Sequence, residues 1–95
     1  MLIRIVRMEF DPAKVNDFKI LFDEVKGKIA GFPGCQHVEL RIDASSNNVF
    51  YTFSKWENED ALEAYRVSEL FTETWKRTKV LFNGKPLAYS LLDVD

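Results

Sequence analysis

His37 is the one histidine in the sequence, and its imidazole could move protons near neutral pH. Histidine is the only residue type whose unperturbed pKa suits this task without help from its surroundings. His37 alternates with Glu39 and Arg41, so this polar face is either solvated or turned to a polar part of a subunit contact. We therefore treat His37 as a candidate catalytic base, with a solvated or hydrogen-bonded strand histidine as the alternative.

Four aromatic side chains could form the walls of a pocket for a flat ligand. They are Tyr51, Trp56, Tyr65 and Trp75. The two tyrosines each carry a hydroxyl on an apolar body, so they could pack against a ligand and also hydrogen-bond to it. Aromatic walls with a few polar groups are typical of a ligand pocket, but the same side chains are also typical of a packed core. Both interpretations stay open on the sequence alone.

Other groups that resemble chemical sites have simpler explanations. Cys35 is the only cysteine, so no intramolecular disulfide can form, and one histidine and one cysteine cannot complete a closed metal site. Glu57, Glu59 and Asp60 resemble a paired-carboxylate cluster, but they fall in the first turn of a predicted helix, where they complement its dipole. We expect no metal.

Composition narrows the choice of partners. The 13 basic and 15 acidic residues give a net charge of −2 and form no basic stripe for nucleic acid. No apolar run approaches the roughly 20 residues of a membrane span, so we expect a cytoplasmic protein that does not enter a membrane. Hydrophobic residues make up 46% of the chain and aromatic residues 14%, which is rich for 95 residues. Such an excess is usually buried against a second copy, and a homodimer is expected.

The pattern of apolar residues predicts the order strand, helix, strand, strand, two helices, strand. The first helix begins at Asp11-Pro12 and ends at the glycines of Gly31-Phe32-Pro33-Gly34, since glycine tolerates a left-handed cap. Strict alternation from Cys35 to Asp43, followed by a turn-prone link, predicts a hairpin with the next strand. Asn58 and Ser68 are the expected caps of the later helices. The predicted strands are Leu2–Phe10, Cys35–Asp43, Val49–Trp56 and Leu87–Val94.

This order indicates an α+β domain of the ferredoxin-like type over residues 1–95, a βαββαβ unit with a four-stranded antiparallel sheet and helices on one side. The helices can cover only one face of that sheet. The first strand nevertheless has Ile3 and Ile5 on one side and Leu2, Val6 and Met8 on the other. Apolar residues on both faces call for a second sheet, so we expect two protomers to form a dimeric α/β barrel.

Three segments carry a resemblance to a known family. They are the FPGC turn at Phe32–Cys35 with the HVEL strand after it, the FSKWENEDALEAY junction at Phe53–Tyr65, and SELFTETW at Ser68–Trp75. Together they resemble the antibiotic biosynthesis monooxygenase family of the dimeric α/β-barrel group. That family includes enzymes that oxidise aromatic polyketides or quinols with O₂ and without metal or flavin. The resemblance therefore implies a cofactor-independent monooxygenase that acts on a hydroxylated aromatic or a quinol.

The resemblance also implies roles for individual residues. Trp56 matches a tryptophan that contacts substrate in the polyketide-oxidising branch, and Thr52 stands where that branch has an oxygen-binding asparagine. Leu62 stands where that branch has a tyrosine, so two polar groups of the branch are replaced. On this basis His37 would move protons and Thr52 would hydrogen-bond the substrate. The substrate would be enclosed by Trp56, Tyr51, Tyr65 and Trp75.

Two other functions stay open. The replacements at Thr52 and Leu62 favour a ligand-binding or stress-related dimer that kept the barrel and lost the chemistry. A third function is haem binding or degradation, as in another branch of the family. In that comparison Trp75 occupies the position of the iron-binding histidine and Tyr65 that of a tryptophan. No predicted helix carries a histidine, so the usual haem ligand is missing.

Overall fold

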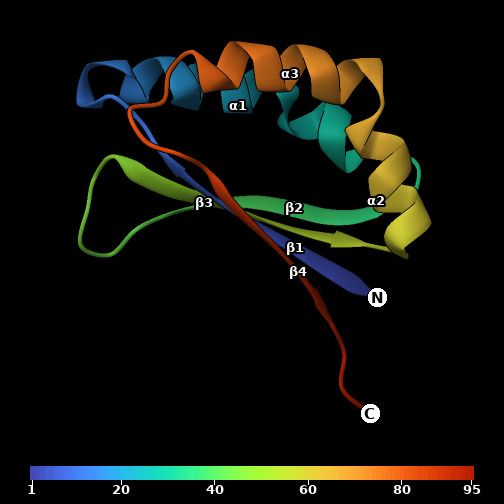
Figure 1. The fold of residues 1–95 in the computed structure, drawn as a ribbon. Coiled ribbons are helices and arrows are strands. Elements are labelled where there is room, and N and C mark those ends of the chain that lie inside the picture. The colour runs from blue at the N-terminus through green and yellow to red at the C-terminus, as the bar shows by residue number, and fades with distance from the viewer.

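The computed structural model describes residues 1–95, with a four-stranded sheet that has all its helices on one face (Figure 1). Helices α1 and α3 run along this face, and α2 lies at one end of it. The elements are β1 (Leu2–Glu9), a 3₁₀ turn (Pro12–Lys14), α1 (Val15–Ala30), β2 (Cys35–Ile42), β3 (Val49–Trp56), α2 (Glu59–Arg66), α3 (Glu69–Lys79) and β4 (Leu87–Leu92).

The sheet has the order β2-β3-β1-β4, and every neighbouring pair is antiparallel. This is the ferredoxin-like arrangement, so the predicted fold class is confirmed. The predicted hairpin is also present, because Ile42 on β2 lies opposite Phe50 on β3. In the centre of the sheet, Leu2 lies opposite Trp56 and Val6 opposite Thr52. The register thus brings the start of β1 beside the end of β3.

Side-chain caps begin the helices where the sequence predicts them. The Asn58 side chain accepts a hydrogen bond of 2.8 Å from the Ala61 amide, and Ser68 accepts one of 3.1 Å from the Phe71 amide. Asp11 also caps as predicted, but the turn it caps is the 3₁₀ segment that leads into α1. The short break between α2 and α3 at Val67 and Ser68 gives the two helices different directions (Figure 1).

The turn after α1 differs in one detail from the expectation. Gly31, which follows the helix directly, has a right-handed φ of −86°, so the left-handed glycine is not the helix cap. Gly34 has the positive φ, at 88°, and it is the only residue that does. Its carbonyl accepts a hydrogen bond of 2.8 Å from the Glu57 amide. The left-handed conformation therefore serves to join the turn to the start of α2.

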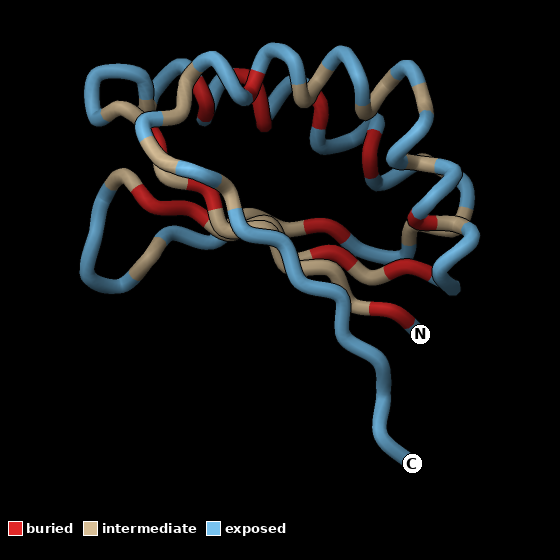
Figure 2. The backbone as a smooth tube through the Cα atoms, in the orientation of Figure 1, coloured by how far each residue is buried: buried red, intermediate tan, exposed pale blue.

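The core lies between the helices and the sheet (Figure 2). Helix α1 buries one stripe of five apolar side chains, Phe18, Leu21, Phe22, Val25 and Ile29. The same cluster contains Met8 of β1, Val38 of β2, Phe50 of β3, and Phe10, which directly follows β1. Phe10 is fully buried and its ring stacks on Phe18 at a centroid distance of 4.1 Å. This end of the layer is tightly filled with side chains.

The opposite face of the sheet is covered by no element of the chain (Figure 1). Ile3 and Ile5 of β1 and Phe53 of β3 lie on this open face and are partly exposed. Tyr89 and Leu91 of β4 extend it and are 51% and 48% exposed. β4 itself ends at Leu92, two residues before the predicted end. Helices α1, α2 and α3 all fall short of the length and apolar character that a membrane-spanning helix needs.

Candidate functional site

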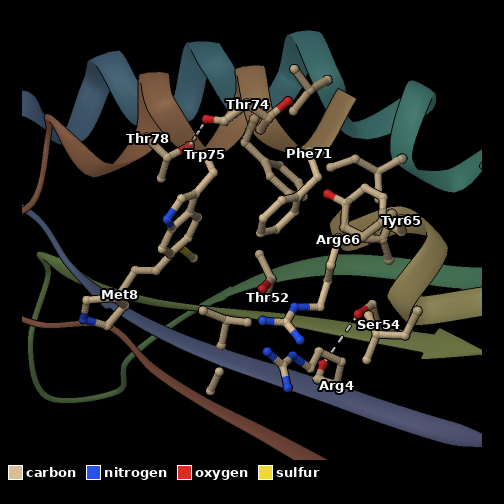
Figure 3. Close-up of a pocket in the computed structure, with 18 of the residues that line it drawn as sticks. Arg4, Met8, Thr52, Ser54, Tyr65, Arg66, Phe71, Thr74, Trp75 and Thr78 are labelled. Atoms are coloured by element: carbon tan, nitrogen blue, oxygen red, sulfur yellow. Dashed lines mark hydrogen bonds between the residues drawn. The ribbon is translucent and has the colours of Figure 1, made fainter. Parts of the chain in front are cut away.

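A cavity of about 360 Å³ lies between the sheet and the helices (Figure 3). Its size falls within the range of small-molecule sites, which is roughly 300–1,000 Å³. Fourteen of its 21 lining residues are hydrophobic. The floor comes from the strands and the roof from the three helices. The lining includes Val6, Met8, Thr52, Ser54, Trp56, Tyr65, Arg66, Phe71, Trp75 and Arg4.

A continuous run of aromatic rings forms one side of the cavity. Trp56 and Tyr65 stack at a centroid distance of 4.9 Å, and Tyr65 meets Phe71 edge to face at 5.2 Å. Phe71 and Trp75 are nearly parallel, with 8° between their planes at 5.9 Å. The helical spacing of Phe71 and Trp75 places them one turn apart on α3, so both rings point toward the sheet (Figure 3). The rings together present an apolar aromatic wall to a ligand.

A few hydroxyl groups interrupt this wall. The Ser54 hydroxyl is already occupied, because it accepts a hydrogen bond of 3.0 Å from the Trp56 indole and donates to the Arg4 carbonyl. The hydroxyls of Thr52 and Tyr65 are engaged by no other group of the chain and stay free for a ligand. Burial raises the pKa of Tyr65 to about 12, and Cys35 nearby adds to the effect. The Tyr65 phenol is thus a neutral hydrogen-bond donor at physiological pH.

Two arginines supply the only formal charges of the cavity lining. Arg4 projects from β1 on the helix-facing side, and Arg66 reaches down from the last turn of α2 toward it (Figure 3). Burial lowers the pKa of Arg4, and repulsion from Arg66 lowers it further. Arg4 donates a hydrogen bond of 2.9 Å to the Ser90 hydroxyl and pairs with no carboxylate. A negative charge placed between the two guanidinium groups would relieve their repulsion.

The cavity brings together four of the six residues named as site candidates from the sequence. Thr52, Trp56, Tyr65 and Trp75 all line it. Tyr51 does not, because strand residues alternate and its neighbours Phe50 and Thr52 take the helix-facing side. His37 also lies outside, since Val38 is the residue of β2 that faces the cavity.

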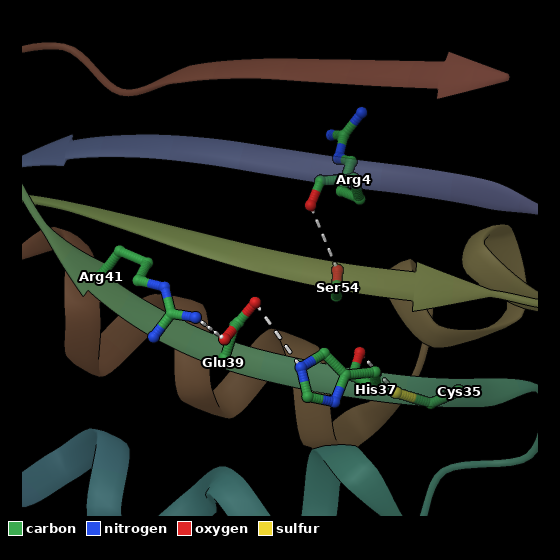
Figure 4. Close-up of polar contacts among 6 residues, drawn as sticks. All are labelled: Arg4, Cys35, His37, Glu39, Arg41 and Ser54. Atoms are coloured by element: carbon green, nitrogen blue, oxygen red, sulfur yellow. Dashed lines mark hydrogen bonds and ion pairs between the residues drawn. The ribbon is translucent and has the colours of Figure 1, made fainter. Parts of the chain in front are cut away.

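Both outlying residues have partners on the open face. The His37 imidazole lies 3.6 Å from Glu39, which also pairs with Arg41, and Figure 4 shows these three side chains along β2 with the helices behind the sheet. The Tyr51 hydroxyl donates a hydrogen bond of 3.0 Å to Asp43. The Ser45 amide and this hydroxyl lower the pKa of the Asp43 carboxyl. Neither side chain lines the cavity, and the roles implied for them stay predictions.

Arg4 and Arg66 were not among the candidates from the sequence. A usable signal existed for Arg4, since the alternation of β1 places it on the apolar side with Leu2 and Val6. A charged residue at an inward position with no acidic partner is uncommon and marks a functional group. Arg66 gave no such signal, because a basic residue in the last turn of a helix is ordinary.

The lining determines which chemistry the cavity can support. It contains no histidine, cysteine, lysine or carboxylate, so its side chains offer neither a metal-binding set nor a conventional base. No group of three such metal ligands forms elsewhere in the chain. The cavity can hold a flat ligand out of water, donate hydrogen bonds to it and stabilise negative charge on it.

Solved structures share the fold over nearly the whole chain. A structure described as an antibiotic biosynthesis monooxygenase has a TM-score of 0.92 and 20% identity, covering 100% of both chains. A protein from Mycobacterium tuberculosis has a TM-score of 0.89 and 18% identity over 99% of this chain and 95% of its own. A conserved protein from Methanosarcina mazei Go1 has a TM-score of 0.89 and 17% identity, covering 96% and 91%. These identities are low, so the likeness concerns the fold.

The sequence itself carries the family signal. No protein of curated function matches it closely enough to count as a relative. A sequence profile of the antibiotic biosynthesis monooxygenase family, however, matches residues 1–77. This stretch runs from β1 to within α3 and includes most of the cavity lining. By this match, the chain belongs to the antibiotic biosynthesis monooxygenase family.

Proposed function

We propose that the chain is a cofactor-independent monooxygenase that oxidises a hydroxylated aromatic or a quinol with O₂. The observation that carries this proposal is the aromatic cavity between sheet and helices in a chain of this family. Its wall of stacked rings fits a flat substrate, and its free hydroxyls and positive charge fit an oxygen anion.

The proposed reaction needs only the substrate and O₂. A phenol that loses its proton becomes electron-rich enough to pass one electron to O₂, which gives a ring radical and superoxide. Recombination at the carbon opposite the oxygen forms a peroxide. That peroxide then loses water and leaves a quinone. One oxygen atom of O₂ enters the quinone, and the other leaves as water with the hydroxyl hydrogen and the ring hydrogen.

Side chains of the cavity would stabilise the substrate anion and keep water away from it. In this proposal Thr52 and Tyr65 donate hydrogen bonds to the substrate oxygen, and the Tyr65 phenol keeps its own proton because its pKa is about 12. Phe71 and Trp75 hold the ring away from water. Since the lining offers no conventional base, the arginine charges would favour loss of the phenol proton to solvent by stabilising the phenolate.

A second copy of the chain is part of the proposal. The open face carries Ile3, Ile5 and Phe53, and a facing sheet would bury them. Pairing would also shield Tyr89 and Leu91 of the edge strand, which are about half exposed. A dimer would hold the sheet rigid beneath the cavity. His37 would then lie at or near the contact, and its predicted part in proton movement depends on that geometry.

Oxygen uptake tests the proposal. Purified protein is mixed with a panel of dihydroxynaphthalenes and anthrones in an oxygen electrode, with catalase and buffer blanks to correct for autoxidation. We expect uptake above the blank for at least one compound. The Thr52→Val variant keeps the shape of the side chain but loses the hydroxyl, and it should reduce the rate by about ten- to a hundredfold. Arg41→Gln, which lies outside the cavity, is the matched control.

A second candidate function is a binding protein without chemistry. The absence of a conventional base from the lining favours it, together with Thr52 in place of the asparagine of the polyketide-oxidising branch. In that case the same compounds would bind, but oxygen uptake would equal the blank. Binding measured under argon alongside uptake in air separates the two functions. Oxygen uptake equal to the blank for every compound would refute the monooxygenase proposal.

A further inference from the structure

We propose that the cavity selects an aromatic ligand that carries a carboxylate, and that Arg4 and Arg66 bind this carboxylate together. The aromatic part of the ligand would extend along the wall formed by Tyr65, Phe71 and Trp75 (Figure 3). This ligand class deepens the proposed function and rests on it, because both place the substrate in the same cavity.

The charge of the lining is the first reason. The chain as a whole has a net charge of −2, yet the cavity contains two positive charges and no negative one. The two guanidinium groups come from different elements, β1 and α2, and they approach each other inside the cavity (Figure 3), where the charge of Arg66 disfavours that of Arg4. Two like charges brought together at an apolar site destabilise the empty protein. Such an arrangement is typical of a site whose ligand supplies the opposite charge.

The partners of the two arginines are the second reason. Arg4 bonds only to the neutral Ser90 hydroxyl and has no carboxylate within ion-pair distance. Arg66 lies 3.4 Å from Glu63 on its own helix, and both side chains are about half exposed. Exposed ion pairs within one helix are weak, because water screens the charges and long side chains lose freedom when they pair. Neither arginine is therefore held by the protein in a way that would prevent it from binding a ligand.

The shape of the groups favours a carboxylate over other anions. Each guanidinium presents parallel N–H groups that match the two oxygens of a carboxylate. The remaining lining is mostly apolar, so the rest of the ligand must be apolar and flat. A phosphate ester carries more free oxygens than a carboxylate, and beyond the two arginines the lining offers only scattered hydroxyls, such as those of Thr52, Tyr65 and Thr74, to bind the oxygens that remain.

Binding of a matched pair of probes tests the inference. 2-Naphthoate and 2-naphthamide have the same ring and nearly the same size, but only the first is charged, and neither is a phenol that could be oxidised. Titration calorimetry under argon at neutral pH gives their affinities for the wild type and for the variants Arg4→Gln, Arg66→Gln and Arg4→Lys. The Arg41→Gln variant is the control, because this arginine lies on the opposite face of the sheet.

We expect the naphthoate to bind the wild type roughly ten- to a hundredfold tighter than the amide, as for a charge-assisted pair. Arg4→Gln should remove most of this preference, and Arg66→Gln should reduce it. Arg4→Lys should retain part of it, and Arg41→Gln should leave it unchanged. Circular dichroism checks each fold, and if Arg4→Gln does not fold, Arg66→Gln and Arg4→Lys decide the test.

Four results would overturn the inference. These are equal affinities for the two probes, a preference that survives both arginine replacements, no binding of the naphthoate in the millimolar range, and tighter binding of 2-naphthol than of the naphthoate. The last would assign the arginines to a phenolate. Because 2-naphthoate and 2-naphthamide are not phenols and cannot undergo the proposed oxidation, a carboxylate preference without oxygen uptake would refute the monooxygenase proposal alone. Oxygen uptake without that preference would refute the ligand class alone.

Discussion

Replacing Gly34 with alanine should destabilise the fold through two separate effects. Gly34 has a φ of 88°, a conformation that L-residues with a β-carbon rarely adopt. A β-carbon at this position would also overlap the β-carbon of Ala61 in the first turn of α2. Since the Gly34 carbonyl holds the amide of Glu57, the turn cannot move away without loosening the start of α2. That helix carries Tyr65 and Arg66 to the cavity.

The expected size follows from these two effects. The left-handed conformation costs an alanine about 1–2 kcal/mol. Forcing an extra methyl group into packed surroundings costs about 1–3 kcal/mol more. We therefore expect Gly34→Ala to lower the free energy of unfolding by about 2–5 kcal/mol, a large share of the roughly 5–15 kcal/mol that stabilises an ordinary domain.

Urea unfolding followed by circular dichroism measures this change. Two further variants serve as a control and separate the two effects. Gly27→Ala is the matched control, because a β-carbon there meets nothing within 4 Å in the interior of α1 and should stabilise by about 0.5–1 kcal/mol. Adding Ala61→Gly to Gly34→Ala removes the overlap but not the backbone strain. The double variant should recover a coupling energy of about 1–3 kcal/mol. A Gly34→Ala protein within about 0.5 kcal/mol of the wild type would refute the reasoning.

Three further predictions concern the Tyr65 phenol, the open face of the sheet and His37. In the unfolded chain the Tyr65 phenol has its ordinary pKa of 10.0, whereas in the folded protein its pKa is about 12. The free energy of unfolding should therefore fall as the pH rises from 10 to 12. Urea midpoints across these pH values should fall by the equivalent of about 2–3 kcal/mol in the wild type but not in Tyr65→Phe. Ile5→Lys with Phe53→Lys should give a monomer in sedimentation, and Val67→Lys, on an exposed helix end, should not. His37→Gln should keep oxygen uptake near the wild-type rate because the imidazole lies outside the cavity, and a tenfold or larger loss would instead support its role in proton movement.

The helices and strands could be predicted from the sequence because the capping residues and the apolar patterns were strong and agreed with one another. The caps at Asn58 and Ser68 and the apolar stripe of α1 each depend on residues only three or four apart. The left-handed glycine could not be placed from such signals. Both Gly31 and Gly34 suit a positive φ, and only the contact with α2 decides that Gly34 adopts it.

Only some residues of the candidate site could be predicted from the sequence. Trp56, Thr52, Tyr65 and Trp75 were found because aromatic residues and family positions mark them, and all four line the cavity. The pair formed by Arg4 and Arg66 could not be predicted, since the two lie 62 positions apart and meet only when α2 packs against β3, the strand next to β1. Pairs between distant elements depend on tertiary packing, which periodicity along the chain does not encode.

Because side chains alternate along a strand, the helix-facing side and the open face of the sheet carry different residues and have different proposed functions. Even-numbered residues of β1 and β3 face the helices and build the cavity, while odd-numbered residues build the open face. Arg4 stands among the even-numbered residues of β1, and Ile3 and Ile5 stand on either side of it on the other face. A ligand held by Arg4 would therefore act on the same short stretch of backbone that a second copy covers. If both proposals hold, weakening the dimer at Ile5 should lower affinity for the naphthoate even though Ile5 cannot touch it, because the strand that fixes Arg4 loses its support.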